Sequence, residues 1–236
     1  MLVVAYFLSI PFSRKAQPAL VRLWYRGVCE LCGLTVKVTG SAPTDGTALM
    51  VSNHISYLDI PLLGAVTGGV FVSKSEVAEW PIMGWLAKLG RTVFIRRKRS
   101  DAAQQIGMLK GRLDGGDSLI VFPEGTSTNG LTVARFKSSL FAVTEAHQDL
   151  TIQPVAVVYS SYKGDRMRLA GGLQDCYAWH GDMDLLPHLI RMLGLAGATT
   201  RVIFLDPVKR SDFEDRKALA LHCEHQISKA VRQYHQ

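Results

Sequence analysis

The chain has 236 residues, of which 47% are hydrophobic, and these values exclude a disordered polypeptide and predict one or two globular domains. Its 27 lysine and arginine residues outnumber its 20 aspartate and glutamate residues, giving a formal net charge of +7. This charge favours an anionic partner, such as phospholipid headgroups, an acidic carrier protein, a phosphorylated substrate or nucleic acid. No run of about 18 apolar residues occurs, so the sequence predicts no transmembrane helix.

Two helices are expected at the N-terminus, over about residues 2–10 and 17–33. The first is too short to span a bilayer and lacks the basic segment of a signal peptide, so it is either buried or lies in a membrane surface. The second is amphipathic and could pack its apolar face in the core or in a lipid interface. Its apolar residues recur at steps of three and four: Leu20, Leu23, Trp24, Val28 and Leu31.

The four cysteines do not form the pattern of a disulfide framework or of a zinc site. Cys29 and Cys32 make one CxxC, but there is no second pair to complete four ligands, and Cys176 and Cys223 stand alone. We therefore expect free thiols in a reducing compartment, with the CxxC thiols buried, and no bound metal.

From residue 47 onward, short apolar runs alternate with helical stretches. Strands are expected over residues 47–53, 69–74, 92–97, 118–125, 152–159, 166–170 and 200–208. Helices are expected over residues 59–66, 80–89, 101–113, 136–146, 184–193 and 212–235. This alternation predicts an α/β domain over residues 41–236, with a mostly parallel sheet covered by helices, preceded by an N-terminal helical element over residues 1–40.

Three polar loops follow predicted strands, at residues 52–59, 96–100 and 123–129. In a parallel sheet, ligands bind at the carboxyl ends of the strands. We therefore expect these three loops to converge on one site.

The first loop contains an imidazole and a carboxylate five residues apart, His54 and Asp59. On one continuous helix these two side chains would point about 140° apart. Pro61 is tolerated best in a first helical turn, however, so the helix should begin near Asp59 and leave His54 in the preceding loop. Asp59 could then orient His54 as a general base, in the manner of a catalytic triad without its serine. The alternative is that Asp59 only caps the helix and His54 is an ordinary polar loop residue.

Four motifs in a fixed order distinguish between these readings. They are NHISYLD (53–59), VFIRR (93–97), FPEGTS (122–127) and QPVAV (153–157). Their order and spacing resemble the four blocks of the glycerolipid acyltransferase family, which includes the 1-acyl-glycerol-3-phosphate acyltransferases. The resemblance covers roughly residues 45–160 and implies the α/β fold of glycerol-3-phosphate acyltransferase.

The resemblance implies that His54 is the general base and Asp59 its orienting partner. It also implies a set of substrate-binding residues: Asn53, Arg97, Glu124, Gly125, Thr126, Lys137 and Pro154. The expected reaction moves an acyl group from acyl carrier protein or coenzyme A to the hydroxyl of a lysolipid. The acyl thioester is a substrate, so we expect no metal and no organic cofactor.

The acceptor is suggested by the residue that follows Glu-Gly-Thr. Enzymes that make phosphatidate typically have an arginine there, whereas this chain has Ser127. The segments FKSSLF (136–141) and WHGDMDLLPHL (179–189) resemble the branch that acylates lyso-ornithine lipid. The N-terminal helices resemble the family's membrane-docking element, which places the protein at the cytoplasmic face of the cell membrane as a peripheral or monotopic protein.

Three other functions remain as alternatives. A nucleic-acid-binding protein would explain the charge and the run at residues 96–99, but not a paired His54 and Asp59, and no stacking motif is visible. A catalytically silent lipid-binding protein of the same fold would retain the dyad without activity. A serine hydrolase lacks support because the sequence contains no GxSxG motif.

Overall fold

The computed structural model describes residues 16–43, 46–81, 83–96, 99–162, 165–166 and 174–235. The helix predicted over residues 2–10 and the predicted substrate-binding residue Arg97 lie outside these ranges.

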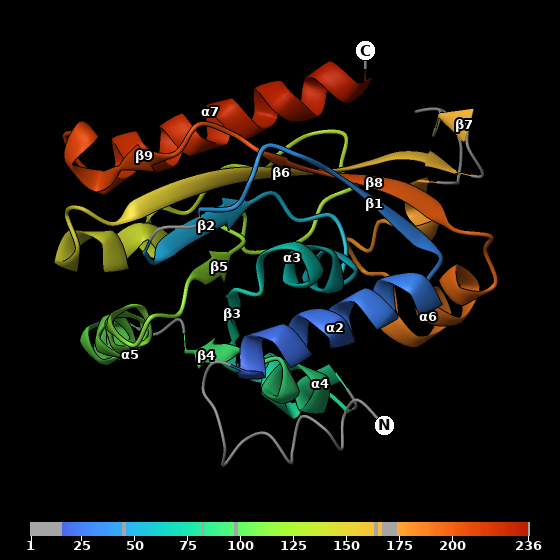
Figure 1. The fold of residues 1–236 in the computed structure, drawn as a ribbon, viewed down its shortest axis with the longest axis horizontal. Coiled ribbons are helices and arrows are strands. Elements are labelled where there is room, and N and C mark those ends of the chain that lie inside the picture. Colours follow the sequence, from blue (N-terminus) through green and yellow to red (C-terminus); the bar gives the residue numbers. More distant parts are fainter. Residues whose placement is uncertain are drawn as a thin grey trace.

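The described elements alternate between strands and helices for most of the chain (Figure 1). The strands are β1 (Leu34–Thr39), β2 (Ala48–Ser52), β3 (Val70–Lys74), β4 (Val93–Ile95), β5 (Leu119–Val121), β6 (Thr151–Tyr162), β7 (Asp165–Arg166), β8 (Ala198–Phe204) and β9 (Val208–Lys209). The α-helices are α2 (Ala16–Leu31), α3 (Asp59–Thr67), α4 (Met83–Leu89), α5 (Ala102–Asp114), α6 (Leu185–Leu193) and α7 (Arg216–His235). The 3-10 helices are η1 (Ser75–Glu79), η2 (Arg99–Asp101), η3 (Ser138–Ala146), η4 (Gln174–Cys176) and η5 (Arg210–Asp212).

The strands form one sheet in the order β1-β8-β6-β2-β5-β3-β4, with the short strands β7 and β9 added to β6. The run from β6 to β4 is parallel throughout, as the sequence predicted. On the other side of β6 the sheet is mixed, because β8 pairs antiparallel with β6 and parallel with β1. The carboxyl ends of β2 and β5, which carry two of the predicted polar loops, are therefore adjacent.

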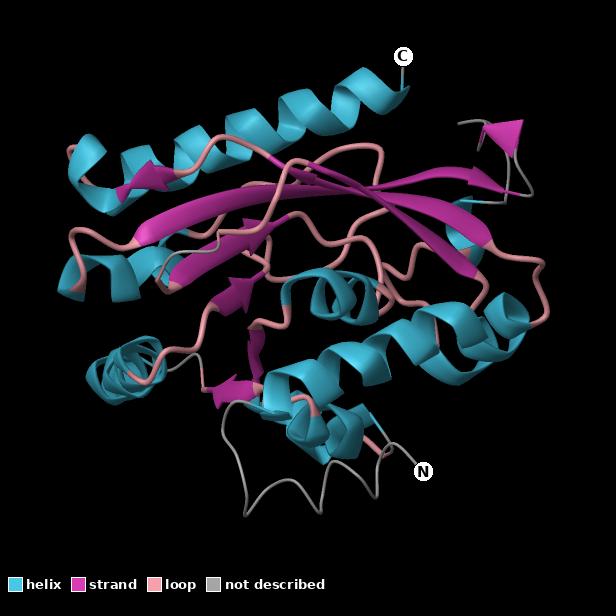
Figure 2. Ribbon diagram, viewed as in Figure 1, coloured by secondary structure: helices cyan, strands magenta, loops and turns pink. Residues whose placement is uncertain are grey.

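Helices cover both faces of the sheet, and the sheet separates two layers of buried side chains (Figure 2). Buried side chains of α5, η3 and α7 pack on one face, and those of α2, α3 and α6 pack on the other. The strands read as continuous apolar runs because both of their faces are buried. β2 shows this most clearly, since all five of its residues are buried.

Two elements differ from the sequence predictions. β1 falls within the range predicted as N-terminal helices, but LTVKVT alternates as a strand and pairs with β8. Gly33 ends the preceding helix at φ +65°, where an added Cβ would lie 2.9 Å from Gly197 Cα. The segment predicted as an α-helix over residues 136–146 contains the 3-10 helix η3, whose serines and β-branched residues are weaker α-helix formers.

The second predicted N-terminal helix exists as α2, and its apolar side chains point in two directions. Val21, Tyr25 and Cys29 are buried in the core beside α3. Leu23 and Leu31, which we predicted on the buried or lipid-facing side, are 48% and 78% exposed. The helix therefore packs in the core by one face and leaves part of its predicted apolar face uncovered.

Among the described residues, no helix is both long and apolar enough to cross a membrane. No disulfide joins any two of the four cysteines, all of which lie in the described ranges, and both members of the CxxC are buried, as predicted. Burial raises the pKa of the Cys29 thiol to about 12, so this thiol is a poor nucleophile.

Candidate active site

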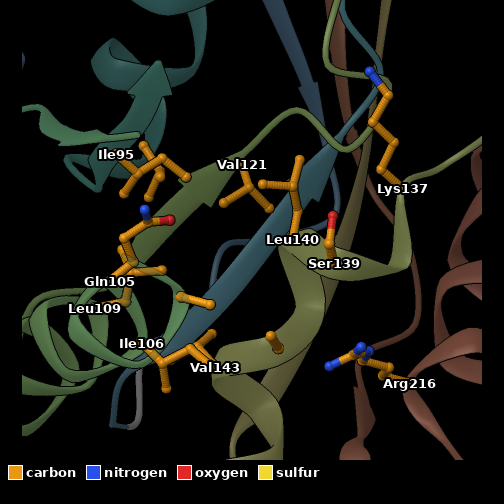
Figure 3. Close-up of a pocket in the computed structure, with 13 residues that line it drawn as sticks. Ile95, Gln105, Ile106, Leu109, Val121, Lys137, Ser139, Leu140, Val143 and Arg216 are labelled. Atoms are coloured by element: carbon orange, nitrogen blue, oxygen red, sulfur yellow. The ribbon is translucent and has the colours of Figure 1, made fainter. Parts of the chain in front are cut away.

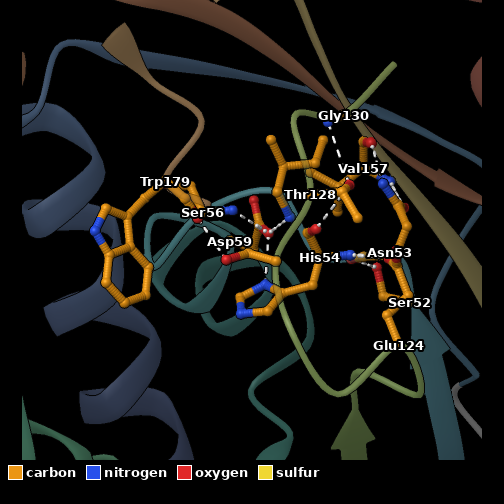
Figure 4. A network of polar contacts seen from close by, with 12 residues as sticks. Ser52, Asn53, His54, Ser56, Asp59, Glu124, Thr128, Gly130, Val157 and Trp179 are labelled. Atoms are coloured by element: carbon orange, nitrogen blue, oxygen red, sulfur yellow. Dashed lines mark hydrogen bonds and ion pairs between the residues drawn. The ribbon is translucent and has the colours of Figure 1, made fainter. Parts of the chain in front are cut away.

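The loop between β2 and α3 brings His54 and Asp59 together (Figure 4). α3 begins at Asp59, with Pro61 in its first turn, so His54 lies outside the helix and can fold back. His54 Nδ1 lies 2.9 Å from Asp59 Oδ2. The same Oδ2 accepts hydrogen bonds from the backbone N–H groups of Ile55, at 2.6 Å, and Ser56, at 3.0 Å. Both groups precede the helix, so Asp59 organises the loop between β2 and α3 and does not cap α3.

The Asp59 carboxylate is fully buried and fully used as an acceptor. Its second oxygen, Oδ1, accepts a hydrogen bond from the Tyr159 hydroxyl at 3.0 Å. Burial and the adjacent Asp59 raise the pKa of Tyr159 well above its ordinary value, so its hydroxyl remains a neutral donor. With donors on both oxygens, the proton shared with His54 resides on Nδ1, and Nε2 carries the lone pair.

His54 is the exposed member of the pair. Its side chain is 19% exposed, and Nε2 makes no hydrogen bond to any residue that the structure describes. The Phe122 ring stacks on the imidazole with centroids 4.1 Å apart and an angle of 17° between the planes. The ring is therefore held from one side by Asp59 and on one face by Phe122, with a basic nitrogen available to a substrate.

Glu124 holds the backbone of the loop between β2 and α3 at His54. Its Oε1 accepts the His54 N–H at 2.7 Å, and its Oε2 accepts the Ala134 N–H at 2.6 Å. The carboxyl group is buried, and burial raises its pKa to about 7 despite these two hydrogen bonds. Because each oxygen accepts a backbone N–H, Glu124 ties the His54 segment to the segment around Ala134. Gly125 follows in a turn at φ +74°, a conformation that glycine adopts readily.

Two further segments, around Thr128 and Trp179, donate hydrogen bonds to the loop between β2 and α3. Thr128 N–H donates to the His54 carbonyl at 2.9 Å, and Trp179 N–H donates to the Ile55 carbonyl at 2.9 Å. The Ser127 hydroxyl donates to the Trp179 carbonyl, which links the two segments. The loops predicted at residues 52–59 and 123–129 therefore do converge, and the segment around Trp179 joins them.

The other predicted substrate-binding residues occupy different environments. Asn53 is buried and joins β2 to β6: its Nδ2 donates to the Val157 carbonyl at 2.9 Å, and its Oδ1 accepts the Val157 N–H at 2.8 Å. Pro154 is buried in β6 opposite Val51. Thr126 and Lys137 are exposed, and Lys137 N–H donates to the Pro123 carbonyl at 2.9 Å.

Comparison with known proteins places this geometry in a family. The sequence profile described as Acyltransferase matches residues 34–158, which is more than half of the chain and includes every predicted site residue. The chain belongs to the acyltransferase family.

Several relatives of this acyltransferase have names that specify a reaction. The lyso-ornithine lipid O-acyltransferase of Rhodobacter capsulatus is 40% identical over 87% of this chain and 75% of its own length. The protein of the same name from Pseudomonas aeruginosa is 37% identical over 90% and 78%. The 1-acyl-sn-glycerol-3-phosphate acyltransferase of Neisseria meningitidis is 30% identical over 87% and 78%.

The fold agrees with a solved structure. The crystal structure of the 1-acyl-sn-glycerophosphate acyltransferase from Thermotoga maritima superposes with a TM-score of 0.69 over 98% of this chain and 94% of that one, at 21% identity. The predicted α/β fold with a mostly parallel sheet is thus confirmed.

The sequence reasoning missed three side chains of this acyltransferase site. Tyr159 supports Asp59, Phe122 stacks on His54, and Tyr57 donates its hydroxyl to His188 Nδ1 at 3.0 Å. His188 is buried, and its Nε2–H faces the carbonyls of Asp175 and Ala178, so it serves as a neutral structural link. The sequence did contain one indication of Tyr159. It is a tyrosine that directly follows an apolar run, residues 154–158, and a buried hydroxyl needs a hydrogen-bond partner.

Proposed function

We propose that this acyltransferase transfers an acyl group from a thioester to the free hydroxyl of a lysolipid, and that its preferred acceptor is lyso-ornithine lipid. The observation that carries the reaction type is the His54–Asp59 pair. Its Nδ1 is held by a buried carboxylate, and its Nε2 makes no hydrogen bond to any described residue. A general base without a protein nucleophile suits a reaction in which the substrate itself supplies the attacking oxygen.

The acceptor is inferred from the relatives and from Ser127. Relatives named lyso-ornithine lipid O-acyltransferase reach 40% identity, whereas those named for 1-acyl-sn-glycerol-3-phosphate reach 30% over a comparable length. Ser127 offers no cation for a phosphate, and its hydroxyl is already used by the Trp179 carbonyl. Both observations favour an acceptor other than lysophosphatidate.

The mechanism begins when His54 Nε2 accepts the proton of the lysolipid hydroxyl as that oxygen attacks the thioester carbonyl carbon. The Asp59 carboxylate, 2.9 Å from Nδ1, stabilises the imidazolium that forms. Collapse of the tetrahedral intermediate breaks the carbon–sulfur bond. The thiolate that leaves accepts the proton from the His54 imidazolium, which returns His54 to its neutral form. A thiol has a pKa of about 8.5, so it leaves without strong acid assistance. A base of this kind contributes about 10²–10⁴-fold to the rate.

Both thioester donors that we consider, acyl carrier protein and coenzyme A, are anionic. The net charge of +7 suits either one. We propose that the donor is one of these two and that no cofactor takes part.

Attachment to the membrane surface is supported by apolar side chains that the fold leaves uncovered. α6 exposes Leu186, Ile190 and Leu193 on one helical face, with exposed fractions of 64%, 65% and 48%. Leu23 and Leu31 of α2 and Trp85 of α4 are also exposed on this side of the sheet. Figure 1 shows α2, α4 and α6 together on this side. We propose that this surface, with the predicted N-terminal helices, contacts the cytoplasmic face of the membrane.

The test of the proposed function is acyl transfer by the purified protein. Lyso-ornithine lipid, lysophosphatidate and lysophosphatidylcholine are each offered with palmitoyl-acyl carrier protein and palmitoyl-coenzyme A. We expect transfer to lyso-ornithine lipid to be the fastest of the three. Faster transfer to lysophosphatidate would overturn the proposed acceptor, and transfer to none of the three would overturn the proposed function.

A second measurement tests the proposed membrane partner. Sedimentation with anionic liposomes and binding to DNA are compared at rising salt concentration. We expect liposome binding to persist at salt concentrations that abolish DNA binding, because burial of apolar side chains is not screened by salt. Preferential binding to DNA would contradict the proposed partner.

A further inference from the structure

A cavity of about 430 Å³ lies on the face of the sheet opposite α3, between α5 and η3 (Figure 3). Its apolar lining comes from strands β3, β4 and β5 and from both helices. The principal apolar lining residues are Val72, Ile95, Val121, Leu109, Leu140 and Val143. Its size is within the range of about 300–1,000 Å³ that is typical of small-molecule sites. The cavity is partly open to solvent, and a concave space lined mainly by apolar side chains is the kind that ligands occupy.

The cavity adjoins the end of β5, the strand that leads to the ring stacked on His54. Val121 lines the cavity, and the next residue, Phe122, stacks on His54. Lys137 also lines the cavity, and its backbone N–H donates to the carbonyl of Pro123. β5 ends at Val121, so a flexible chain that leaves the cavity at this end passes the edge of the sheet next to His54.

Two cations of the described chain line the cavity, and only one of them is available to a ligand. Figure 3 shows Lys137 and Arg216 on the side of the cavity away from α5, separated from each other. Arg216 is paired with Glu145 at 3.0 Å, whereas Lys137 is exposed and makes no ion pair with any described acidic side chain. An apolar cavity with such an ammonium matches a single-chain amphiphile with an anionic headgroup.

We propose that this cavity binds the alkyl chain of the acceptor lysolipid and that Lys137 pairs with the acceptor's anionic headgroup. The assignment to the acceptor follows from where each substrate carries its charge. A lysolipid has its carboxylate or phosphate a few bonds from the nucleophilic hydroxyl, next to His54. An acyl thioester has no charge near its reacting carbonyl. This inference rests on the proposed function for the identity of the ligand, but the cavity can be tested separately.

The reaction also requires a place for the acyl chain of the thioester donor, and a group of three aromatic side chains could line it. The ring of Trp179 packs edge-to-face against Tyr57, at 6.0 Å, and Trp80, at 6.1 Å. This group lies with α3 on the face opposite the cavity. His54, at the strand edge, therefore has one apolar region on each side, and two chains can meet there without sharing one space.

Binding of alkyl carboxylates, from octanoate to dodecanoate below their critical micelle concentrations, tests the cavity without any acyl transfer. Calorimetric titration compares the wild type with Ala102→Phe, which places a ring at the cavity, and with Ala103→Phe. Ala103 is the matched control because it is exposed on the same helix and does not line the cavity. We expect wild-type affinity to rise about threefold to fourfold per added methylene. In Ala102→Phe this rise should stop at a shorter chain and leave dodecanoate at least about tenfold weaker.

The headgroup contact has its own matched pair. Lys137→Gln should weaken dodecanoate and dodecyl phosphate by about twofold to fivefold, the effect of an exposed ion pair, and leave neutral dodecanol unchanged. Arg135→Gln removes an exposed cation nearby that does not line the cavity and should change none of the three. A larger effect on the phosphate than on the carboxylate would indicate a phosphate headgroup instead of a carboxylate.

Two outcomes overturn the inference. One is equal dodecanoate affinity in the wild type and Ala102→Phe. The other is found in acyl transfer: Ala102→Phe should raise the KM for the lysolipid and leave the KM for the thioester unchanged, and the reverse pattern would assign the cavity to the donor. If the protein transfers no acyl group at all, the proposed function fails, while the chain-length series still reports on the cavity.

Discussion

Replacement of Asp59 by asparagine separates the two roles that the structure gives this residue, orientation of His54 and electrostatic stabilisation. The carboxylate receives the Tyr159 hydroxyl on Oδ1 and three donors on Oδ2, from His54, Ile55 and Ser56. An asparagine has only one acceptor oxygen. Its most favourable placement keeps that oxygen at the Oδ2 position and turns the amide NH₂ toward Tyr159, because a hydroxyl can rotate to accept whereas a backbone N–H cannot.

The expected loss follows from this placement. If the oxygen stays at the Oδ2 position, His54 keeps its proton on Nδ1, and only the negative charge is removed. A carboxylate and an imidazolium about 4 Å apart interact by about 4 kcal/mol at an effective dielectric constant of about 20. Since about 1.4 kcal/mol corresponds to a factor of ten, kcat should fall by about 10²–10³-fold. A reversed amide would hold the wrong tautomer, and the loss would reach about 10⁴-fold.

The assay is kcat at saturating thioester and lysolipid for four proteins: the wild type, Asp59→Asn, Tyr159→Phe and the double variant. Tyr159→Phe alone leaves Oδ1 without its donor and should cost only a few-fold in rate, with a loss of about 1–3 kcal/mol in stability. In the double variant the amide loses the partner that orients it, so the loss should exceed the product of the two single losses. A wild-type rate in Asp59→Asn would refute the orienting role, and strictly multiplicative losses would refute the role of Tyr159.

Three further predictions concern groups around this pair. Burial raises the pKa of Glu124 from 4.5 to about 7, so the folded state binds this proton more tightly and loses stability as the pH rises through that window. Urea denaturation should give a free energy of unfolding that is lower at pH 8 than at pH 5 by up to about 3 kcal/mol, and this difference should be absent from Glu124→Gln. Identical pH profiles in the two proteins would contradict the prediction. Gly64→Ala would place a Cβ 2.2 Å from Tyr25 Cδ2, so it should lower the free energy of unfolding by about 1–3 kcal/mol. The Cβ of Gly107→Ala on α5 would have nothing within 4 Å, so this control should be neutral or stabilising by up to about 1 kcal/mol. Equal effects of the two substitutions would show that the α2–α3 contact is not tight. Ser127→Arg should raise the rate with lysophosphatidate relative to lyso-ornithine lipid, while Ser127→Ala, which removes only the hydroxyl, should not; an unchanged ratio in both variants would separate this position from acceptor choice.

The sequence predicted those parts of the fold that depend on local pattern. Apolar runs located β2, β3 and β5, and Pro61 placed the start of α3 at the correct residue. β1 was missed because six residues of alternating character directly follow a helix and become a strand only by pairing with β8, more than 160 residues away. The antiparallel pairing of β6 with β8 is likewise a long-range property that local periodicity does not encode.

The contact between His54 and Asp59 could be predicted from the sequence, but the residues that support it could not. His54 and Asp59 are five residues apart, so one loop geometry brings them together. Tyr159 lies 100 residues from Asp59, and its hydroxyl reaches the carboxylate only because β6 pairs with β2. Glu124 was predicted to bind substrate, and this role stays a prediction. Its buried carboxylate also holds the His54 backbone, and that contact depends on burial that the motif alone does not show.

The central claim is that His54 acts as the general base for transfer of an acyl group to a lysolipid hydroxyl. The most direct test is acyl transfer to lyso-ornithine lipid by the wild type and His54→Ala, with folding of both proteins verified by circular dichroism. We predict transfer by the wild type and a rate about 10²–10⁴-fold lower in the variant. Equal rates in the two proteins would contradict the claim.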